Sequence, residues 1–308
     1  MTAIVEVQRL TKSYGGARGI IDVSFEVGEG EAFGFLGPNG AGKTTTIRLL
    51  MALLRPDAGA ARIAGLDCWR DSLEIKRLVG YAPGEPALDP ELTGGQILEY
   101  LGHLRGGVDQ QYLRQLTERL DLDPSRKFRQ YSSGNKRKVV LVQALMHRPR
   151  LIILDEPTNG LDPLNQQEFG RMVDEVRRDG GTVFLSSHVL SEVEQWCTRV
   201  AIIREGRIVR AGGVSEVKDI KRYEVTILFA CAVPAETFER LDGVARVETT
   251  AGGLGLRLEM QGPADAVIKA AAQHQVVSLS SHEPSLEDIF LRYYEADGRA
   301  VREATRVV

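Results

Sequence analysis

Apolar residues in the first two-thirds of the chain occur in short runs that alternate with longer segments of helical periodicity. The short runs predict buried strands at residues 32–36, 151–154, 182–186 and 200–203. Apolar positions three and four residues apart predict helices at residues 43–54, 94–104, 111–120, 138–146 and 166–178. Short buried strands interleaved with helices predict an α/β fold with a mostly parallel sheet.

The pattern changes near residue 218, after a Gly-Gly step and a polar run. Beyond it the sequence predicts strands at 224–229, 245–249, 254–259 and 276–280, and helices at 235–241, 264–273 and 286–294. Their order matches a small ferredoxin-like α+β sandwich, followed by one more helix. An irregular tail packed on the main domain is the alternative. We therefore predict two domains, residues 1–218 and 219–308.

Composition and charge narrow the class of protein. A chain of 308 residues with 43% hydrophobic residues can bury a globular core, and no run of apolar residues is long enough to predict a membrane span. The net charge of −3 gives no electrostatic footprint for nucleic acid, and the N-terminus lacks the layout of a secretory signal. The three cysteines, Cys68, Cys197 and Cys231, are widely spaced, which indicates reduced thiols in a cytoplasmic protein.

The most specific pattern is a glycine-rich loop between the strand at 32–36 and the helix that follows. It reads Gly37-Pro38-Asn39-Gly40-Ala41-Gly42-Lys43-Thr44-Thr45 and fits the P-loop pattern. The backbone N–H groups of such a loop, with the N-terminus of the helix, bind phosphate oxygens. We expect Lys43 to contact the β- and γ-phosphates of a nucleotide and the Thr44 hydroxyl to bind Mg²⁺. The alternative is a glycine-rich turn that binds nothing.

Two carboxylates, Asp155 and Glu156, directly follow the buried strand at 151–154. Ionised acids at the end of an apolar run are costly unless a cation lies nearby. We expect Asp155 to hold Mg²⁺, commonly through water, and Glu156 to face the attacking water as a catalytic residue. Alternatively, the two acids only cap the strand into a turn.

With these motifs and others in the same order, the sequence resembles the ATP-binding subunits of ABC transporters over about residues 4–215. The resemblance implies that Tyr14 stacks on adenine, that Asp162 is a dimer contact and that His188 contacts the γ-phosphate as a catalytic residue. It places the signature loop, which in this family meets ATP held by a second copy, at Ser132, Ser133, Gly134 and Asn135. Plainer interpretations are a turn aromatic for Tyr14, a core residue for His188 and an Asp-Pro turn for Asp162.

Two departures from the family pattern stand out. The signature is usually Leu-Ser-Gly-Gly-Gln, whereas this chain has Tyr131-Ser-Ser-Gly-Asn135. Where the family generally has a glutamine that meets Mg²⁺ and water, this chain has Gly84, followed by Glu85 as a possible substitute. This second departure puts two properties in question, the rate of ATP hydrolysis and its coupling to a partner.

The resemblance also implies how the protein works. A homodimer would enclose two ATP molecules with Mg²⁺, and a separate integral membrane permease would dock on a helical subdomain at about residues 86–147. Residues 284–291 resemble the tail of bacterial drug- and antibiotic-export ATPases of the daunorubicin- and bacitracin-resistance type. We therefore expect an ATPase that energises export from the cytoplasmic face of the membrane. The alternatives are an importer ATPase and a soluble ABC ATPase that acts on nucleic acid or the ribosome.

Overall fold

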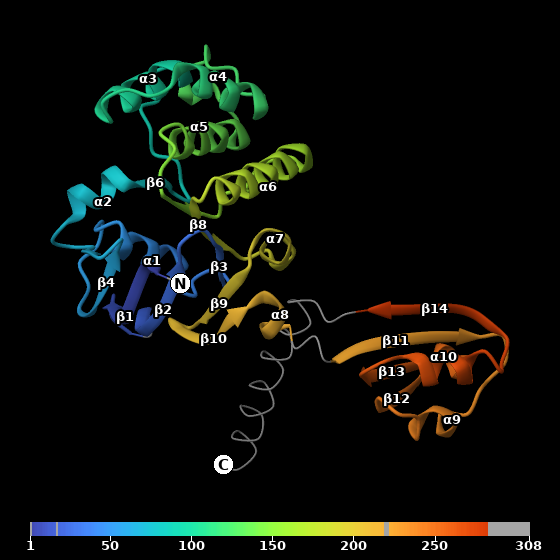
Figure 1. Ribbon diagram of the computed structural model, residues 1–308. Coiled ribbons are helices and arrows are strands. Elements are labelled where there is room, and N and C mark those ends of the chain that lie inside the picture. Colours follow the sequence, from blue (N-terminus) through green and yellow to red (C-terminus); the bar gives the residue numbers. More distant parts are fainter. Residues whose placement is uncertain (1, 17, 219–221, 283–308) are drawn as a thin grey trace. The chain divides into compact units, whose positions relative to one another are not determined.

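The computed structural model describes residues 2–16, 18–218 and 222–282 (Figure 1). The chain divides into two compact units, Met1–Val214 and Ser215–Val308. This division lies four residues before the boundary that the sequence predicts, within a short helix, α8 (Val214–Val217). Among the described residues, the structure contains no helix that is both long and apolar enough to span a bilayer.

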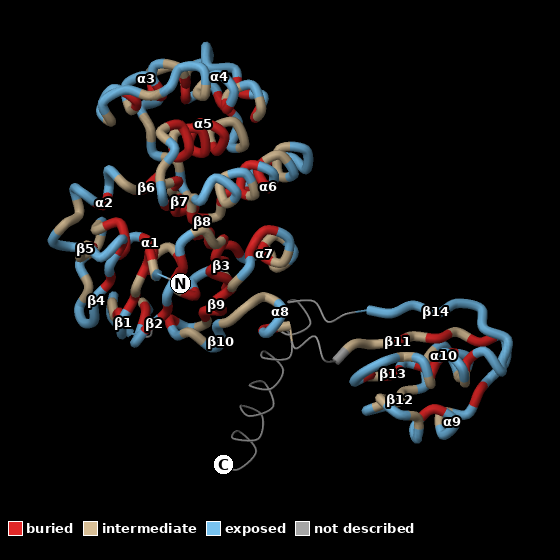
Figure 2. Tube along the Cα trace, in the orientation of Figure 1, coloured by how far each residue is buried: buried red, intermediate tan, exposed pale blue. Residues whose placement is uncertain are grey.

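A six-stranded sheet forms the centre of the first unit. Its strands follow the order β10-β9-β3-β8-β7-β6, and all neighbours are parallel except the β9–β10 pair. The bounds are β3 (Ala32–Leu36), β6 (Val79–Ala82), β7 (Leu151–Asp155), β8 (Thr182–Ser187), β9 (Arg199–Arg204) and β10 (Arg207–Gly213). Every residue of β3, β7 and β8 is buried, as the continuous apolar runs predict (Figure 2). The prediction of a mostly parallel sheet is confirmed.

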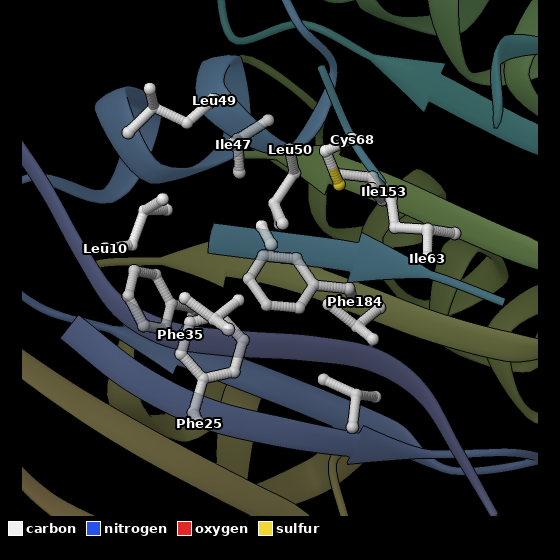
Figure 3. Packing of buried hydrophobic residues seen from close by; sticks show 14 of the residues in the cluster. Leu10, Phe25, Phe35, Ile47, Leu49, Leu50, Ile63, Cys68, Ile153 and Phe184 are labelled. Carbon is white, nitrogen blue, oxygen red and sulfur yellow. The ribbon is translucent and has the colours of Figure 1, made fainter. Parts of the chain in front are cut away.

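A second, antiparallel sheet packs on the first. Its order is β2-β1-β4-β5, with β1 (Ala3–Ser13), β2 (Gly19–Gly28), β4 (Ala58–Ile63) and β5 (Leu66–Asp67). Between the two sheets and helix α1 (Lys43–Leu50) lies the main hydrophobic core (Figure 3). Phe25, Phe35 and Phe184 meet there at ring-centroid distances of 5.2 to 5.8 Å. This core fixes the strand ends from which the P-loop and the two carboxylates emerge.

The remaining helices of the first unit cover the central sheet or form a separate layer (Figure 1). They are α2 (Ser72–Leu78), α3 (Gly94–Leu104), α4 (Gln110–Arg119), α5 (Ser133–Leu145), α6 (Pro163–Arg178) and α7 (Leu190–Trp196), with a 3₁₀ turn at Phe128–Gln130. Helix α3 has the predicted bounds. Helix α1 ends four residues before residue 54, because the chain leaves helical geometry at Met51 and Ala52. The elements α3, α4 and α5 lie within the predicted helical subdomain.

Helix α5 begins five residues before the start that the sequence predicts. Ser132 is its N-cap, and the Ser132 hydroxyl accepts a hydrogen bond from the backbone N–H of Asn135. The prediction of a start at residue 138 is therefore wrong, because the polar residues from Ser133 onward were interpreted as a loop. As a result, three of the four signature residues occupy the first turn of a helix.

The second unit is a four-stranded antiparallel sheet with two helices. Its elements are β11 (Arg222–Phe229), α9 (Glu236–Glu239), β12 (Val244–Thr250), a 3₁₀ turn at Ala251–Gly253, β13 (Gly255–Gln261), α10 (Asp265–Ala271) and β14 (Val276–His282). The strand order is β12-β13-β11-β14, and Phe238 of α9 and Val267 of α10 share one core with Ile227 and Leu258 of the sheet. Both helices therefore cover the same face, and the predicted ferredoxin-like order is confirmed. The helix predicted at 286–294 and the tail motif at 284–291 lie outside the described residues.

Candidate active site

The P-loop connects the buried end of β3 to the first turn of α1. Gly42, the last residue before the helix, has φ of 114°, and a Cβ on it would lie 2.5 Å from a methyl carbon of Ile20. A Cβ on Gly37 would lie 2.3 Å from the carbonyl oxygen of Ile203. Neither position has room for a side chain, so these glycines are needed for the tight path of the loop.

Lys43 points back into the loop from the start of α1. Its ammonium donates hydrogen bonds to the carbonyl oxygens of Gly37 (2.5 Å) and Pro38 (3.2 Å), and it lies 3.0 Å from Oε1 of Glu156. Both side chains of this ion pair are largely buried, with 6% and 13% of their surfaces exposed. The ammonium is thus aimed at the centre of the loop, where it neutralises a buried carboxylate.

Thr44 and Asp155 meet at the ends of α1 and β7. The Thr44 hydroxyl donates a hydrogen bond of 2.8 Å to Oδ2 of Asp155, and the Asp155 side chain is almost fully buried. A hydroxyl and a carboxylate side by side form the hard oxygen donor set that Mg²⁺ prefers, with other positions left for phosphate oxygens and water. The two residues that the sequence assigns to Mg²⁺ are therefore brought together and fit that ion.

Glu156 follows Asp155 in a backbone conformation that is rare for a residue with a side chain, with φ of 50°. Its backbone N–H donates to the carbonyl oxygen (3.2 Å) and the hydroxyl (3.1 Å) of Ser186 in the neighbouring strand β8. This turn directs the carboxylate toward Lys43 on one side and His188 on the other, where Oε2 lies 2.7 Å from Nδ1. His188 is thus not a core histidine: its side chain is 39% exposed and pairs with Glu156.

A pocket of about 480 Å³ joins most of the predicted nucleotide-binding residues. Its lining comprises Tyr14, Arg18, Gly19, Pro38, Asn39, Gly40, Gly42, Lys43, Thr44, Thr45 and Glu156. Tyr14 is 51% exposed, so one face of its ring is available to a planar group. Sequence reasoning missed Arg18. No local pattern identifies it, because it reaches the pocket only through the turn between β1 and β2.

The signature residues lie elsewhere. None of Ser132, Ser133, Gly134 and Asn135 lines the pocket that holds Lys43 in the described part of this chain. Ser132 and Ser133 are exposed, whereas a Cβ on Gly134 would lie 2.4 Å from the carbonyl oxygen of Gly160. The N-terminus of α5 is therefore packed by its backbone against the loop that follows Glu156.

Asp162 caps helix α6. Its carboxylate accepts hydrogen bonds of 3.1 Å from the backbone N–H groups of Leu164 and Asn165. The hydrogen bonds from the backbone N–H and then from the side-chain amide of Asn165 lower the pKa of the Asp162 carboxyl. Within one chain, Asp162 therefore acts as a turn and capping residue, as the plainer interpretation expects. Its role as a dimer contact stays a prediction.

The loop at Gly84 lies directly against the Mg²⁺-site carboxylate. A Cβ on Gly84 would lie 3.1 Å from Oδ2 of Asp155, and Glu85 beside it is exposed. Arg137 of α5, which is only 4% exposed, donates hydrogen bonds to the carbonyl oxygens of Pro83 (2.6 Å) and Gly84. Arg137 was not among the predicted site residues, yet it connects the signature helix to this loop.

Glu85 makes no hydrogen bond or ion pair with the site residues within the ranges that the structure describes, and the suggestion that it replaces the missing glutamine gains no support. Cys68 and Cys197 are buried, and burial raises the pKa of the Cys68 thiol to about 12 and that of Cys197 as well. All three cysteines are free, but the prediction of packing thiols fits only the two buried ones, because Cys231 is exposed.

Comparison with known proteins identifies the family. Residues 20–159 match the model of the ABC transporter family, and residues 212–294 match the C-terminal domain of DrrA1-3-like ATP-binding proteins. The daunorubicin resistance ATP-binding protein DrrA3 of Streptomyces coeruleorubidus is 33% identical, over 97% of this chain and 98% of the relative. The bacitracin transport ATP-binding protein BcrA of Bacillus licheniformis is 31% identical, over 95% of this chain and 97% of the relative.

Solved structures agree with this assignment. The ATP-binding subunit of an ABC transporter superposes with a TM-score of 0.65 and 31% identity, over 70% of this chain and 92% of that one. A dimeric ATP-binding cassette with ADP and Pi has the same fold, with a TM-score of 0.63 and 22% identity over 68% of this chain and 98% of that one. This chain therefore belongs to the ATP-hydrolysing ATP-binding proteins of ABC transporters, in the group that carries a DrrA-like C-terminal domain.

Proposed function

We propose that this protein is the Mg²⁺-dependent ATPase subunit of an exporter of small molecules of the drug or antibiotic type. It would act at the cytoplasmic face of the membrane together with a separate permease. The assignment to export rests on relatives that are named for daunorubicin, bacitracin and linearmycin resistance and that match almost the whole chain. For the same reason we favour export over import and over action on nucleic acid or the ribosome.

The chemistry follows from the contacts of Lys43. Its ammonium, now bonded to two loop carbonyls and paired with Glu156, would transfer to the β- and γ-phosphates of ATP when a polyphosphate enters the loop. Glu156 would then be released from its cation. A carboxylate freed from an ion pair at this point can accept a proton from the attacking water.

Mg²⁺ at Thr44 and Asp155 would neutralise charge on the β- and γ-phosphate oxygens. With both ring nitrogens protonated, His188 would donate one hydrogen bond to the Glu156 carboxylate, 2.7 Å away, and a second to the γ-phosphate. Tyr14 would cover the adenine at the open side of the pocket, with Arg18 beside it. Each residue thus binds or orients the nucleotide or water, and none needs to form a covalent bond with it.

A second copy of the chain would complete each site. The observation that carries this part is that the four signature residues lie outside the nucleotide pocket of their own chain. In a two-fold dimer, the exposed Ser132 of one copy would reach the γ-phosphate bound to the other. A cassette with the same fold is dimeric in its solved structure.

Replacing Ser132 by arginine is expected to abolish most of the ATPase activity, because the larger side chain keeps the signature of one copy away from the γ-phosphate bound to the other. The nucleotide affinity of the single chain should not change. Loss of the N-cap is expected to cost only about 1 kcal/mol of stability, so the variant should fold. Ser125→Arg, at another exposed serine, is the matched control and should be active.

Mixing two inactive variants tests this arrangement more sharply. Ser132→Arg has an intact P-loop and Lys43→Ala has an intact signature, so a mixed dimer contains one complete site. Activity should reappear on mixing if the site is shared between copies. If mixing restores nothing while dimers form, the signature does not act across the dimer.

The permease would dock in a groove between α2 and the helical subdomain. The groove has a volume of about 1020 Å³, and its walls carry exposed Leu73 and Leu104, which are 64% and 67% exposed. Lys76 and Arg105 add positive charge, and burial lowers the pKa of His147 to about 4, so this histidine is neutral. An amphipathic helix with acidic residues on its polar side fits such a groove.

Replacing Leu104 by aspartate is expected to weaken binding of the permease about tenfold or more, because it removes apolar contact area and adds a repelling charge for an acidic helix. ATP binding by the free subunit should be unchanged. Leu164→Asp, at a leucine that is 77% exposed on α6, is the control. Co-purification in detergent measures the effect. If Leu104→Asp co-purifies as well as the control does, the permease does not use this groove.

A further inference from the structure

Ser186 stands at the carboxyl end of β8, directly opposite Asp155 in the parallel pairing of β7 and β8. Its side chain is completely buried, although it is polar. Neither the motif reasoning nor the roles proposed above include it. A buried hydroxyl is costly unless it is hydrogen-bonded, so its partners indicate what it does.

The hydroxyl has two partners, and each belongs to one of the two carboxylate residues. It donates a hydrogen bond of 2.6 Å to Oδ1 of Asp155, and it accepts one of 3.1 Å from the backbone N–H of Glu156. A serine hydroxyl has a single proton to donate, and here Asp155 receives it. Ser186 therefore connects the Mg²⁺-site carboxylate to the backbone of the residue that would face the water.

The first hydrogen bond decides which oxygen of Asp155 is available to a metal. With Oδ1 held by Ser186, Oδ2 is the oxygen that lies 2.8 Å from the Thr44 hydroxyl. Rotation of the carboxylate would break the bond to Ser186, so the hydroxyl opposes it. The oxygen that would face the metal is thus set by a residue that is not among those lining the nucleotide pocket in the described part of the chain.

The second hydrogen bond supports the left-handed backbone of Glu156. That conformation is strained in a residue with a side chain, and it persists only where neighbouring groups hold it. The Glu156 N–H is shared between the hydroxyl and the carbonyl oxygen of Ser186. If the hydroxyl is removed, this N–H keeps the carbonyl contact of 3.2 Å but loses the hydroxyl as its second acceptor.

We propose that Ser186 is a positioning residue of the ATPase site, which orients Asp155 toward Mg²⁺ and holds Glu156 in the turn that faces the water. This inference rests on the proposed function, because it assumes that Thr44 and Asp155 bind the Mg²⁺ of Mg-ATP. It predicts that loss of the Ser186 hydroxyl weakens nucleotide binding only when Mg²⁺ is present.

The test is Ser186→Ala, which removes one oxygen atom without adding volume. Binding of a fluorescent non-hydrolysable ATP analogue is measured in EDTA and then during titration with MgCl₂. In EDTA the affinity of the variant should equal that of the parent. The MgCl₂ concentration for the half-maximal gain in affinity should rise about 10- to 100-fold, as is usual when a partner of a metal ligand is removed. Ser187→Ala is the matched control.

Ser187 is the adjacent serine and is equally buried, but its hydroxyl donates to Glu192, at 2.9 Å, and not to Asp155. Ser187→Ala should therefore require the same Mg²⁺ concentration as the parent. The inference is overturned if Ser186→Ala shows an unchanged Mg²⁺ requirement, or if its affinity falls equally with and without Mg²⁺. If the parent itself shows no gain in affinity on adding Mg²⁺, the proposed metal site fails instead.

Discussion

A Glu156→Gln variant is expected to bind ATP as tightly as the parent, or more tightly, while its turnover falls at least 100-fold. Glutamine keeps the size of the side chain but cannot accept the proton of the attacking water, and such a base typically contributes 10²–10⁴ in rate. The change also removes the negative charge that lies 3.0 Å from Lys43, so the ammonium is no longer held by a competing anion. ATP should therefore accumulate on the protein.

Phosphate release under single-turnover conditions measures the rate of ATP hydrolysis. The elution volume of the variant in size-exclusion chromatography with ATP shows whether dimers accumulate. Glu29→Gln is a suitable control, because Glu29 pairs with Arg150 on the surface and has no contact with the pocket. Hydrolysis by Glu156→Gln at the parental rate would assign the base to another residue. His188 and its 2.7 Å contact would then need a different explanation.

The second large effect is expected from Lys43→Ala, which should weaken ATP binding about 10- to 100-fold or more. The lysine would supply charge-assisted hydrogen bonds to the phosphates, and each such bond contributes about 1.5–3 kcal/mol. Its removal also leaves the buried Glu156 carboxylate beside the phosphates without a counter-charge. Both changes oppose the binding of a polyanion.

Equilibrium titration with a fluorescent nucleotide measures this loss. Lys12→Ala is the control, since Lys12 pairs with Asp57 at 2.7 Å and does not line the pocket. Retention of parental affinity in Lys43→Ala would exclude this loop as the phosphate site. Thermal unfolding should accompany the titration, because the lysine is only 5% exposed and its loss changes the packing of the loop.

The helical subdomain illustrates where local reasoning fails. The sequence predicts this helix to begin at residue 138, whereas the structure places residues 136–138 in its first two turns. Arg137 and Lys138 are nearly fully buried, because each donates hydrogen bonds to carbonyl oxygens of segments far away in the chain. A charge pattern alone favours solvent exposure, and only distant partners make burial of such cations affordable.

Local sequence patterns are enough to predict the parts of the site that depend on neighbours along the chain. The P-loop of Gly37–Thr45 lies between a buried strand and a helix, and Asp155 and Glu156 end the next such strand, because apolar runs and glycine spacing act locally. The predicted order of elements in the second unit follows for the same reason.

How these pieces meet depends on packing between segments that are far apart in the sequence. The contacts of Asp155 with Ser186 and Thr44, of Arg137 with Gly84 and of His188 with Glu156 join residues 31 to 111 positions apart. The antiparallel sheet likewise depends on pairing between strands from separate segments. The position of Arg18 in the lining of the nucleotide pocket depends on the same pairing. Such contacts form when the whole core packs, and no periodicity or spacing in the chain records them.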